Sequence, residues 1–302
     1  MIEAIVIAGR ILTGPLVNLC QKKFAGEKNE PFFIVWNTHL LMTLIAVPLL
    51  LCCGGISASR GFCFVIALAA LLDFTGNALT VYSLKMTALS IFGPINAYKP
   101  LFALVFGFLL LDERPGLWGV LGMLLILGGT WLLNAPEEED GETIRTSGRI
   151  SGFFLSKGVW LRFAAQLIFA LGAIYLKKAV MIGGPLLSFA GWALLPLPVA
   201  ALCCAVAHKN LWGKGLLKKT GAAICHEPFR WASLALLNSA MQILTLWAFS
   251  MIFVGYALAC FQLSALLHVY LGHRFFGEKN LRARLGGALI MGLGAVLILL
   301  GS

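Results

Sequence analysis

A stretch near the middle of the chain recurs without a gap near its end. The first copy, Gly107–Gly129, reads GFLLLDERPGLWGVLGMLLILGG, and the second, Gly272–Gly294, reads GHRFFGEKNLRARLGGALIMGLG. The offset between the copies is 165 residues (272 − 107). The same offset pairs further residues, namely Thr80 with Thr245, Met86 with Met251, Glu113 with Glu278, and Gly122 with Gly287. The chain therefore contains two copies of one structural element.

Ten apolar runs cover most of the chain, and each is near the roughly 20 residues that cross a bilayer. They lie at about 2–20, 32–53, 61–84, 88–111, 116–134, 160–182, 186–207, 231–252, 254–275 and 281–300. Five runs per copy is an odd number, so the copies cross the membrane in opposite directions. Many secondary transporters build one site, reachable from either face, in this way. The predicted fold class is all-α, a polytopic membrane protein with ten transmembrane helices as two inverted five-helix repeats.

Composition excludes a water-soluble globule. Hydrophobic residues make up 60% of the chain and charged residues 12%, whereas about a quarter of a soluble protein is charged. The net charge is +10, but the basic residues lie in short loops beside the spans and form no continuous basic surface. We therefore expect no nucleic-acid partner. No basic leader precedes the first run, which we expect to be retained as a helix. The eight cysteines are expected to pack in the core and to bind no metal.

Two hydrophilic connections interrupt the apolar pattern. The first, 135–159, is acidic at its start and is predicted to be a solvated linker between a first repeat at 1–134 and a second at 160–302. The second connection, 208–230, is basic, and anionic lipid headgroups are its expected partner. Its basic residues are Lys209, Lys214, Lys218, Lys219 and Arg230.

Charged and amide side chains inside the spans are the candidate site. Asp73 and Lys99 each lie thirteen residues from the predicted turn near Met86 (86 − 73 and 99 − 86), which places both roughly 20 Å down one hairpin, within reach of each other. Asn77 and Asn96 continue the two polar faces, and Gln242 lies on the equivalent face of the second copy. Two interpretations remain open: these residues line a cavity, or they form a buried ion pair with amides that fix the helix register.

Further candidates extend this set. Pro100 leaves the carbonyl of Asn96 without a helical donor, which is typical of a break that faces water or ligand, or of a packing kink. Arg10 could supply a second cation for a carboxylate or phosphate. Three more residues could line the second half of the cavity or add an aromatic wall, although each could equally fill the core: Gln262, His268 and Tyr98.

The ends of the two copies carry a family resemblance. Ala97–Leu101 leads through Leu111–Pro115 into a glycine-rich helix, and Gln262 leads through Gly277–Asn280 into another. The chain resembles the EamA-type domain of the drug/metabolite transporter superfamily, present twice over nearly all 302 residues. The resemblance implies a ten-helix carrier of small organic solutes, in which four helices of each half surround a central cavity and the fifth and tenth pack outside.

Glutamates and glycines of the repeated stretch are expected to be structural. Glu113 and Glu278 would each favour the positive end of the following helix. The glycines would allow close helix packing, since lipid gives helices no hydrophobic drive to associate. These are Gly119, Gly122, Gly128 and Gly129 in the fifth helix, and Gly286, Gly287, Gly292 and Gly294 in the tenth.

Two arguments on the orientation of the chain disagree. Most of the 23 Lys and Arg lie on the side opposite to the termini, so the positive-inside rule places both termini outside the cytoplasm. The family resemblance implies cytoplasmic termini. Both orientations stay open.

The sequence as a whole predicts a secondary transporter, without catalytic residues or cofactors, that works by alternating access around a midplane cavity. The expected substrate is an amino acid or another zwitterionic or anionic solute. The alternatives are a flippase for lipid-linked intermediates and a membrane scaffold or receptor that transports nothing. We expect a multi-pass protein of a bacterial cytoplasmic membrane, in contact with membrane lipids, as a monomer or homodimer.

Overall fold

The computed structural model describes residues 2–25, 31–52, 59–86, 95–96, 98–133, 157–207, 214–264, 267 and 281–301. His268, Glu278 and most of the predicted linker lie outside these residues.

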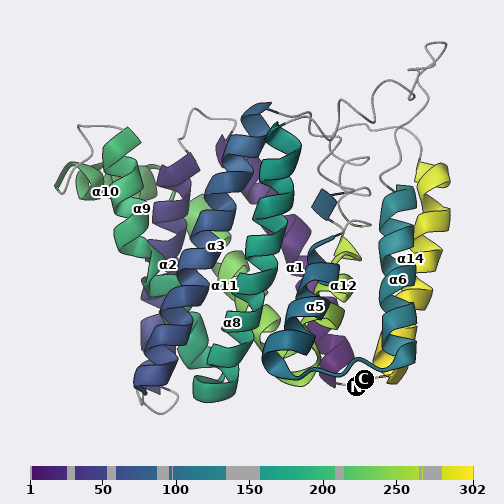
Figure 1. Cartoon of the computed structure of the whole chain (residues 1–302). Helices are drawn as coiled ribbons and strands as arrows, with labels where there is room; N and C mark the ends of the chain where they lie inside the picture. The colour runs from purple at the N-terminus through teal and green to yellow at the C-terminus, as the bar shows by residue number, and fades with distance from the viewer. Residues whose placement is uncertain are drawn as a thin grey trace, which may run out of the picture. The chain divides into compact units, whose positions relative to one another are not determined.

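Every regular element in the described ranges is an α-helix, so the predicted all-α class is confirmed (Figure 1). The helices are α1 Ile2–Ala25, α2 Pro31–Cys52, α3 Arg60–Met86, α5 Lys99–Leu111, α6 Leu117–Leu133, α8 Lys157–Leu194, α9 Pro196–Ala207, α10 Lys214–His226, α11 Pro228–Met251, α12 Val254–Phe261 and α14 Leu281–Gly301.

Several helices are suited to a bilayer by length and composition. Among the described residues, four stretches are long and apolar enough to cross it: Phe32–Leu51, Arg60–Asn77, Lys157–Val206 and Pro228–Met251. Lys157–Val206 contains a break, because Gly184 has φ 75° and Pro185 follows it. Positive φ is accessible to glycine at little cost, and proline lacks the donor that would continue the helix. The break falls between the predicted spans 160–182 and 186–207.

The helices form two compact units. Unit 1 comprises Met1–Ala70 and Tyr175–Met251, and unit 2 comprises Leu71–Ile174 and Ile252–Ser302. Helices α3 and α8 each pass from one unit to the other midway along their length. Each unit therefore combines segments from both predicted repeats.

Within unit 2, α6 and α14 lie side by side and touch through reciprocal glycine contacts (Figure 1). A Cβ atom added to Gly122 would lie 2.5 Å from the carbonyl oxygen of Gly294, and one added to Gly129 would lie 2.6 Å from that of Gly287. The sequence offset makes Gly287 the equivalent of Gly122, and Gly294 the equivalent of Gly129. Gly122 therefore touches the equivalent of Gly129, and Gly129 touches the equivalent of Gly122. Such reciprocity is the signature of a two-fold axis. The two helices are therefore antiparallel and related by pseudo-two-fold symmetry.

Not all of the predicted packing glycines take part. Added Cβ atoms at Gly128, Gly286 and Gly292 would meet nothing within 4 Å, so close packing does not require glycine at these three positions. The contact spacing follows one face of each helix, and these residues lie off that face. Gly119 instead packs against the Tyr256 side chain.

Glu113 caps a helix that is distant from it in the chain. Its two carboxylate oxygens accept the backbone N–H of Val254 at 3.2 and 3.3 Å, at the start of α12. An anionic group is favourable there because the N-terminal N–H groups carry partial positive charge. The expected interaction of Glu113 with the following helix, α6, stays a prediction. Tyr256, in the same helix, makes a second contact with the connection between α5 and α6, because its hydroxyl donates to the carbonyl of Gly116 at 3.1 Å.

Unit 1 has its own core, built on α1, α2 and α11. Val17, Ile34, Trp231 and Leu234 are buried together there. Gly9 lets α1 approach α11, because an added Cβ would lie 3.1 Å from a methyl group of Leu244. The basic connection 208–230, expected to be a loop, contains the thirteen-residue helix α10.

Candidate functional site

The side-chain oxygen of Asn96, in unit 2, accepts three hydrogen bonds. Arg162 donates two of them, from Nε at 3.0 Å and from Nη2 at 2.6 Å, and Gln166 donates the third from Nε2 at 2.9 Å. Arg162 and Gln166 are one turn apart on α8, so both side chains reach the same atom. Both are buried, with 9% and 4% of their surfaces exposed. A cation and two amides thus meet at the side of α8, a helix that is apolar along most of its length.

A new helix begins just after Asn96, so the backbone carbonyl of Asn96 can accept a hydrogen bond from a side chain. The helix α5 begins at Lys99, after the turn residue Tyr98, with Pro100 in its first turn. Proline has no N–H, so the Asn96 carbonyl lacks the donor that a continuous helix would give it. Gln262 Nε2 donates to this carbonyl instead, in a long hydrogen bond of 3.4 Å. Asn96 is therefore held at both its backbone and its side chain.

Lys99 lies over an aromatic ring of α8. Its Nζ is 5.0 Å from the centre of the Phe169 ring, a distance at which the ring face attracts a cation. The ring in turn packs on α3, where a Cβ atom added to Gly76 would lie 2.9 Å from it. Farther along, Ser83 Oγ donates to the carbonyl of Gly158 at 2.9 Å, so α3 and α8 run antiparallel here. Gly76 thus fixes the distance between α3 and the ring under Lys99.

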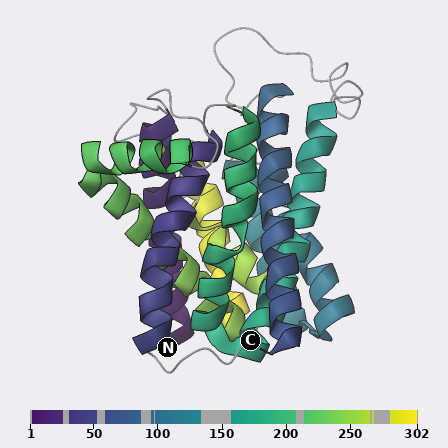
Figure 2. The same cartoon turned by 90° about the vertical axis from the view of Figure 1, so that its left-hand side faces the viewer.

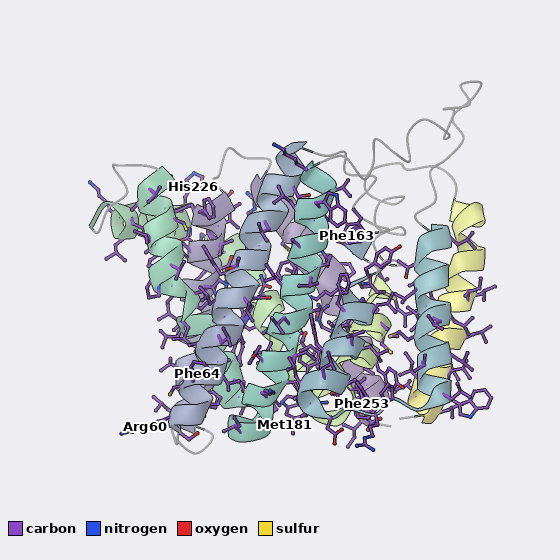
Figure 3. The ribbon with its side chains drawn as sticks, viewed as in Figure 1. Arg60, Phe64, Phe163, Met181, His226 and Phe253 are labelled. Carbon is purple, nitrogen blue, oxygen red and sulfur yellow. The ribbon has the colours of Figure 1, made fainter. Side chains whose placement is uncertain are left out.

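Aromatic rings flank the polar cluster. The ring centres of Tyr98 and Phe163 are 5.3 Å apart, and those of Phe163 and Trp160 are 6.1 Å apart. Phe163, labelled in Figure 3, follows Arg162 directly on α8. Tyr98 is 39% exposed, so part of its ring is open to a ligand. The predicted aromatic residue Tyr98 therefore lies beside the cation of α8.

Asp73 and Asn77 are the part of the predicted site that α3 carries. Both belong to unit 2, and the Asn77 side chain donates to the backbone carbonyl of Asp73 at 2.9 Å. In this structure the Asn77 amide therefore bonds to its own helix. The ion pair between Asp73 and Lys99 stays a prediction.

Two of the predicted residues belong to unit 1. Arg10 Nε donates to Thr245 Oγ1 at 2.7 Å, and that hydroxyl donates to the carbonyl of Met241 at 2.8 Å. Gln242 is buried next to them in sequence, on α11. Arg10 and Gln242 thus belong to unit 1, whereas Asn96, Lys99 and Gln262 belong to unit 2. His268 lies outside the described residues.

Sequence reasoning missed Arg162 and Gln166, the two residues that bind the Asn96 side chain. Arg162 is close to the start of an apolar run, where a cation usually belongs to the membrane edge. The spacing of the polar and aromatic residues in this run could have identified them. Arg162, Gln166 and Phe169 follow i, i+4 and i+7, which places a cation, an amide and a ring on one helix face.

Comparison with known proteins bears on this arrangement directly. The sequence profile of the EamA-like transporter family matches residues 16–135, which include Asn96, Lys99 and the capping Glu113. Residues 16–135 are therefore similar in sequence to an EamA-like transporter domain. The second EamA-like copy, expected at 160–302, is not shown by this match and stays a prediction.

Solved structures agree on the fold over the whole chain. A protein crystal structure superimposes with a TM-score of 0.72, covering 99% of this chain and 97% of that chain at 17% sequence identity. At that identity the likeness establishes the fold alone. No curated protein matches the sequence. The match over residues 16–135 points to a membrane transporter of small molecules, since members of the matched family are transporters rather than enzymes.

Proposed function

We propose that this protein is a secondary transporter for a small anionic or zwitterionic organic solute, such as an amino acid, and that the solute's anionic group binds at Arg162 and Lys99. The observation that carries the proposal is the convergence of Arg162 and Gln166 on one neutral oxygen of Asn96. Alternating access is supported by the pseudo-two-fold relation of α6 and α14, because inverted repeats are the usual basis of that mechanism.

The chemistry of Arg162 favours an anion. Its Nε and Nη2 atoms donate side by side, which is the pattern that binds a carboxylate or phosphate with two parallel hydrogen bonds. The Asn96 oxygen satisfies these donors without contributing a negative charge. A carboxylate that replaced it would keep both hydrogen bonds and add a favourable charge interaction, which is strong where water is excluded.

Other residues of unit 2 suit the rest of such a solute. Lys99 adds a second positive charge, held over the Phe169 ring, three residues from Asn96. Asp73, on the neighbouring part of α3, supplies a carboxylate that can accept an amino group. A cation pair with one carboxylate fits a zwitterion, and the partly exposed ring of Tyr98 can cover an apolar side chain.

The proposal is tested by uptake into proteoliposomes. Radiolabelled amino acids and short organic acids are offered one at a time to vesicles that contain the purified protein. We expect at least one of them to enter faster than it enters protein-free vesicles, and Arg162→Ala to abolish that uptake. Arg162→Lys should retain only a small part, because lysine keeps the charge but loses the paired donors.

Arg114→Ala is the matched control, since Arg114 is in the same unit but its side chain is 80% exposed and pairs with the exposed Asp112. Uptake should be unchanged in this variant. The proposal fails if folded Arg162→Ala transports as well as the wild type, or if uptake is confined to neutral or cationic solutes.

A further inference from the structure

The helix α10 lies across the ends of the spans of unit 1. It connects the end of α9 to the start of α11, and Figure 2 shows it nearly perpendicular to α2 and α9. It packs on the first turns of α2, where Trp36 Nε1 donates to Thr220 Oγ1 at 2.9 Å. Three spans begin or end at this level, so α10 is placed at a membrane face.

One face of α10 is fixed to the protein. Leu216 and Thr220, one turn apart, are both buried. The Nζ atom of Lys219 is 4.6 Å from the centre of the Phe33 ring, which fixes this lysine at the edge of the helix. The helix is thus held in one orientation, and its opposite face is defined.

The exposed side of α10 and the first residues after it combine positive charge with apolar side chains. Lys218 and Lys219 are exposed, and the residues of α10 include no aspartate or glutamate. Leu217 is 59% exposed, and Phe229, just beyond the helix, is 87% exposed. Glu227, the nearest acid, forms an ion pair with Arg230. Large apolar side chains beside lysines are typical of a helix that lies in the headgroup layer.

We propose that α10 lies in the headgroup layer and binds anionic phospholipid, with Lys218 and Lys219 contacting the headgroup phosphate while Leu217 and Phe229 enter the acyl region. Basic residues beside a span attract anionic lipid by about a factor of five each, so the two lysines together give roughly a thirty-fold preference. The inference is independent of the solute that the transporter carries.

Native mass spectrometry of the full chain, released from detergent with added lipid, tests this inference. Phosphatidylglycerol and phosphatidylcholine with identical acyl chains are the probes. Wild type should bind phosphatidylglycerol roughly thirty-fold more tightly than the double variant Lys218→Gln/Lys219→Gln. Phosphatidylcholine should bind equally to both proteins. Lys218→Arg/Lys219→Arg, which keeps both positive charges on α10, is the matched control and should behave as wild type.

Equal binding of phosphatidylglycerol by wild type and the Lys218→Gln/Lys219→Gln double variant would overturn the inference, and so would equal binding of the two lipids by wild type. A second measurement needs no variant. In wild type the preference for phosphatidylglycerol should fall as ionic strength rises, because salt screens exposed charges. A preference that does not change with salt would also overturn the inference.

Discussion

Asn96→Asp is expected to abolish the binding of anionic solutes, and with it transport, while the protein stays folded. The substitution replaces the neutral oxygen with a carboxylate of the same shape, at the atom where Arg162 and Gln166 already donate. The two Arg162 bonds then become a charge-assisted pair, and such bonds are roughly twice as strong as neutral ones. Breaking a buried pair of this kind costs about 3–5 kcal/mol, so a solute should bind roughly 100-fold more weakly or worse.

The control for this prediction is Asn96→Ala, which removes the acceptor without adding a charge. The N–H groups of Arg162 and Gln166 that bind Asn96 are then available to the solute, and uptake should persist. Proteoliposome uptake by the two variants, at equal reconstituted protein, is the measurement. Uptake by Asn96→Asp at the wild-type level would contradict the account. Equal loss of uptake in both variants would contradict the account as well, because it would show that transport requires the Asn96 side chain itself.

Gly122→Val is expected to destabilise the pairing of α6 with α14 severely. The new Cβ would lie 2.5 Å from the carbonyl oxygen of Gly294 and 2.9 Å from the backbone nitrogen of Ile298. These are backbone atoms of a helix, which cannot turn aside as a flexible side chain can, so the helices must separate. Overpacking of this kind costs about 1–3 kcal/mol, and the lost packing adds to it because little else holds helices together in lipid.

The matched control lies on the same helix. A Cβ atom added to Gly128 would meet nothing within 4 Å, so Gly128→Val should leave the protein close to wild type. Thermal denaturation followed by size-exclusion chromatography measures both variants. Gly129→Val should resemble Gly122→Val, because the pseudo-two-fold axis gives the two glycines equivalent contacts. A Gly122→Val protein as stable as Gly128→Val would contradict the packing that relates the two copies.

The repeated stretch predicted close packing of the fifth and tenth helices, because glycines in lipid permit close helix contact, but it did not predict that these two helices pair with each other. The polar residues in the spans were also informative, because a charge in a bilayer is costly and normally faces a cavity or a partner side chain. Pro100 showed which carbonyl would be left without a helical donor, and the structure supplies the donor, Gln262.

Partners distant in the chain could not be predicted in the same way. A glutamate such as Glu113 can be expected at a helix N-terminus, but its contact with the start of α12, 141 residues away, depends on the fold. Arg162 was missed because its position in an apolar run did not reveal its partner Asn96, 66 residues away. Helix α10 was not predicted because its contacts with Trp36 and Phe33 of α2 join residues that are far apart in the chain.

The binding of an anionic group at Arg162 is the central claim, and ligand-induced thermal stabilisation tests it most directly. Purified wild type and Arg162→Ala are melted with amino acids, organic acids, sugar phosphates, nucleosides and quaternary amines. A ligand present at 100 times its dissociation constant stabilises the folded state by about 2.7 kcal/mol, which is readily measured. We predict that an anionic or zwitterionic compound raises the melting temperature of wild type but not that of Arg162→Ala. Equal stabilisation of both proteins by that compound would contradict the account.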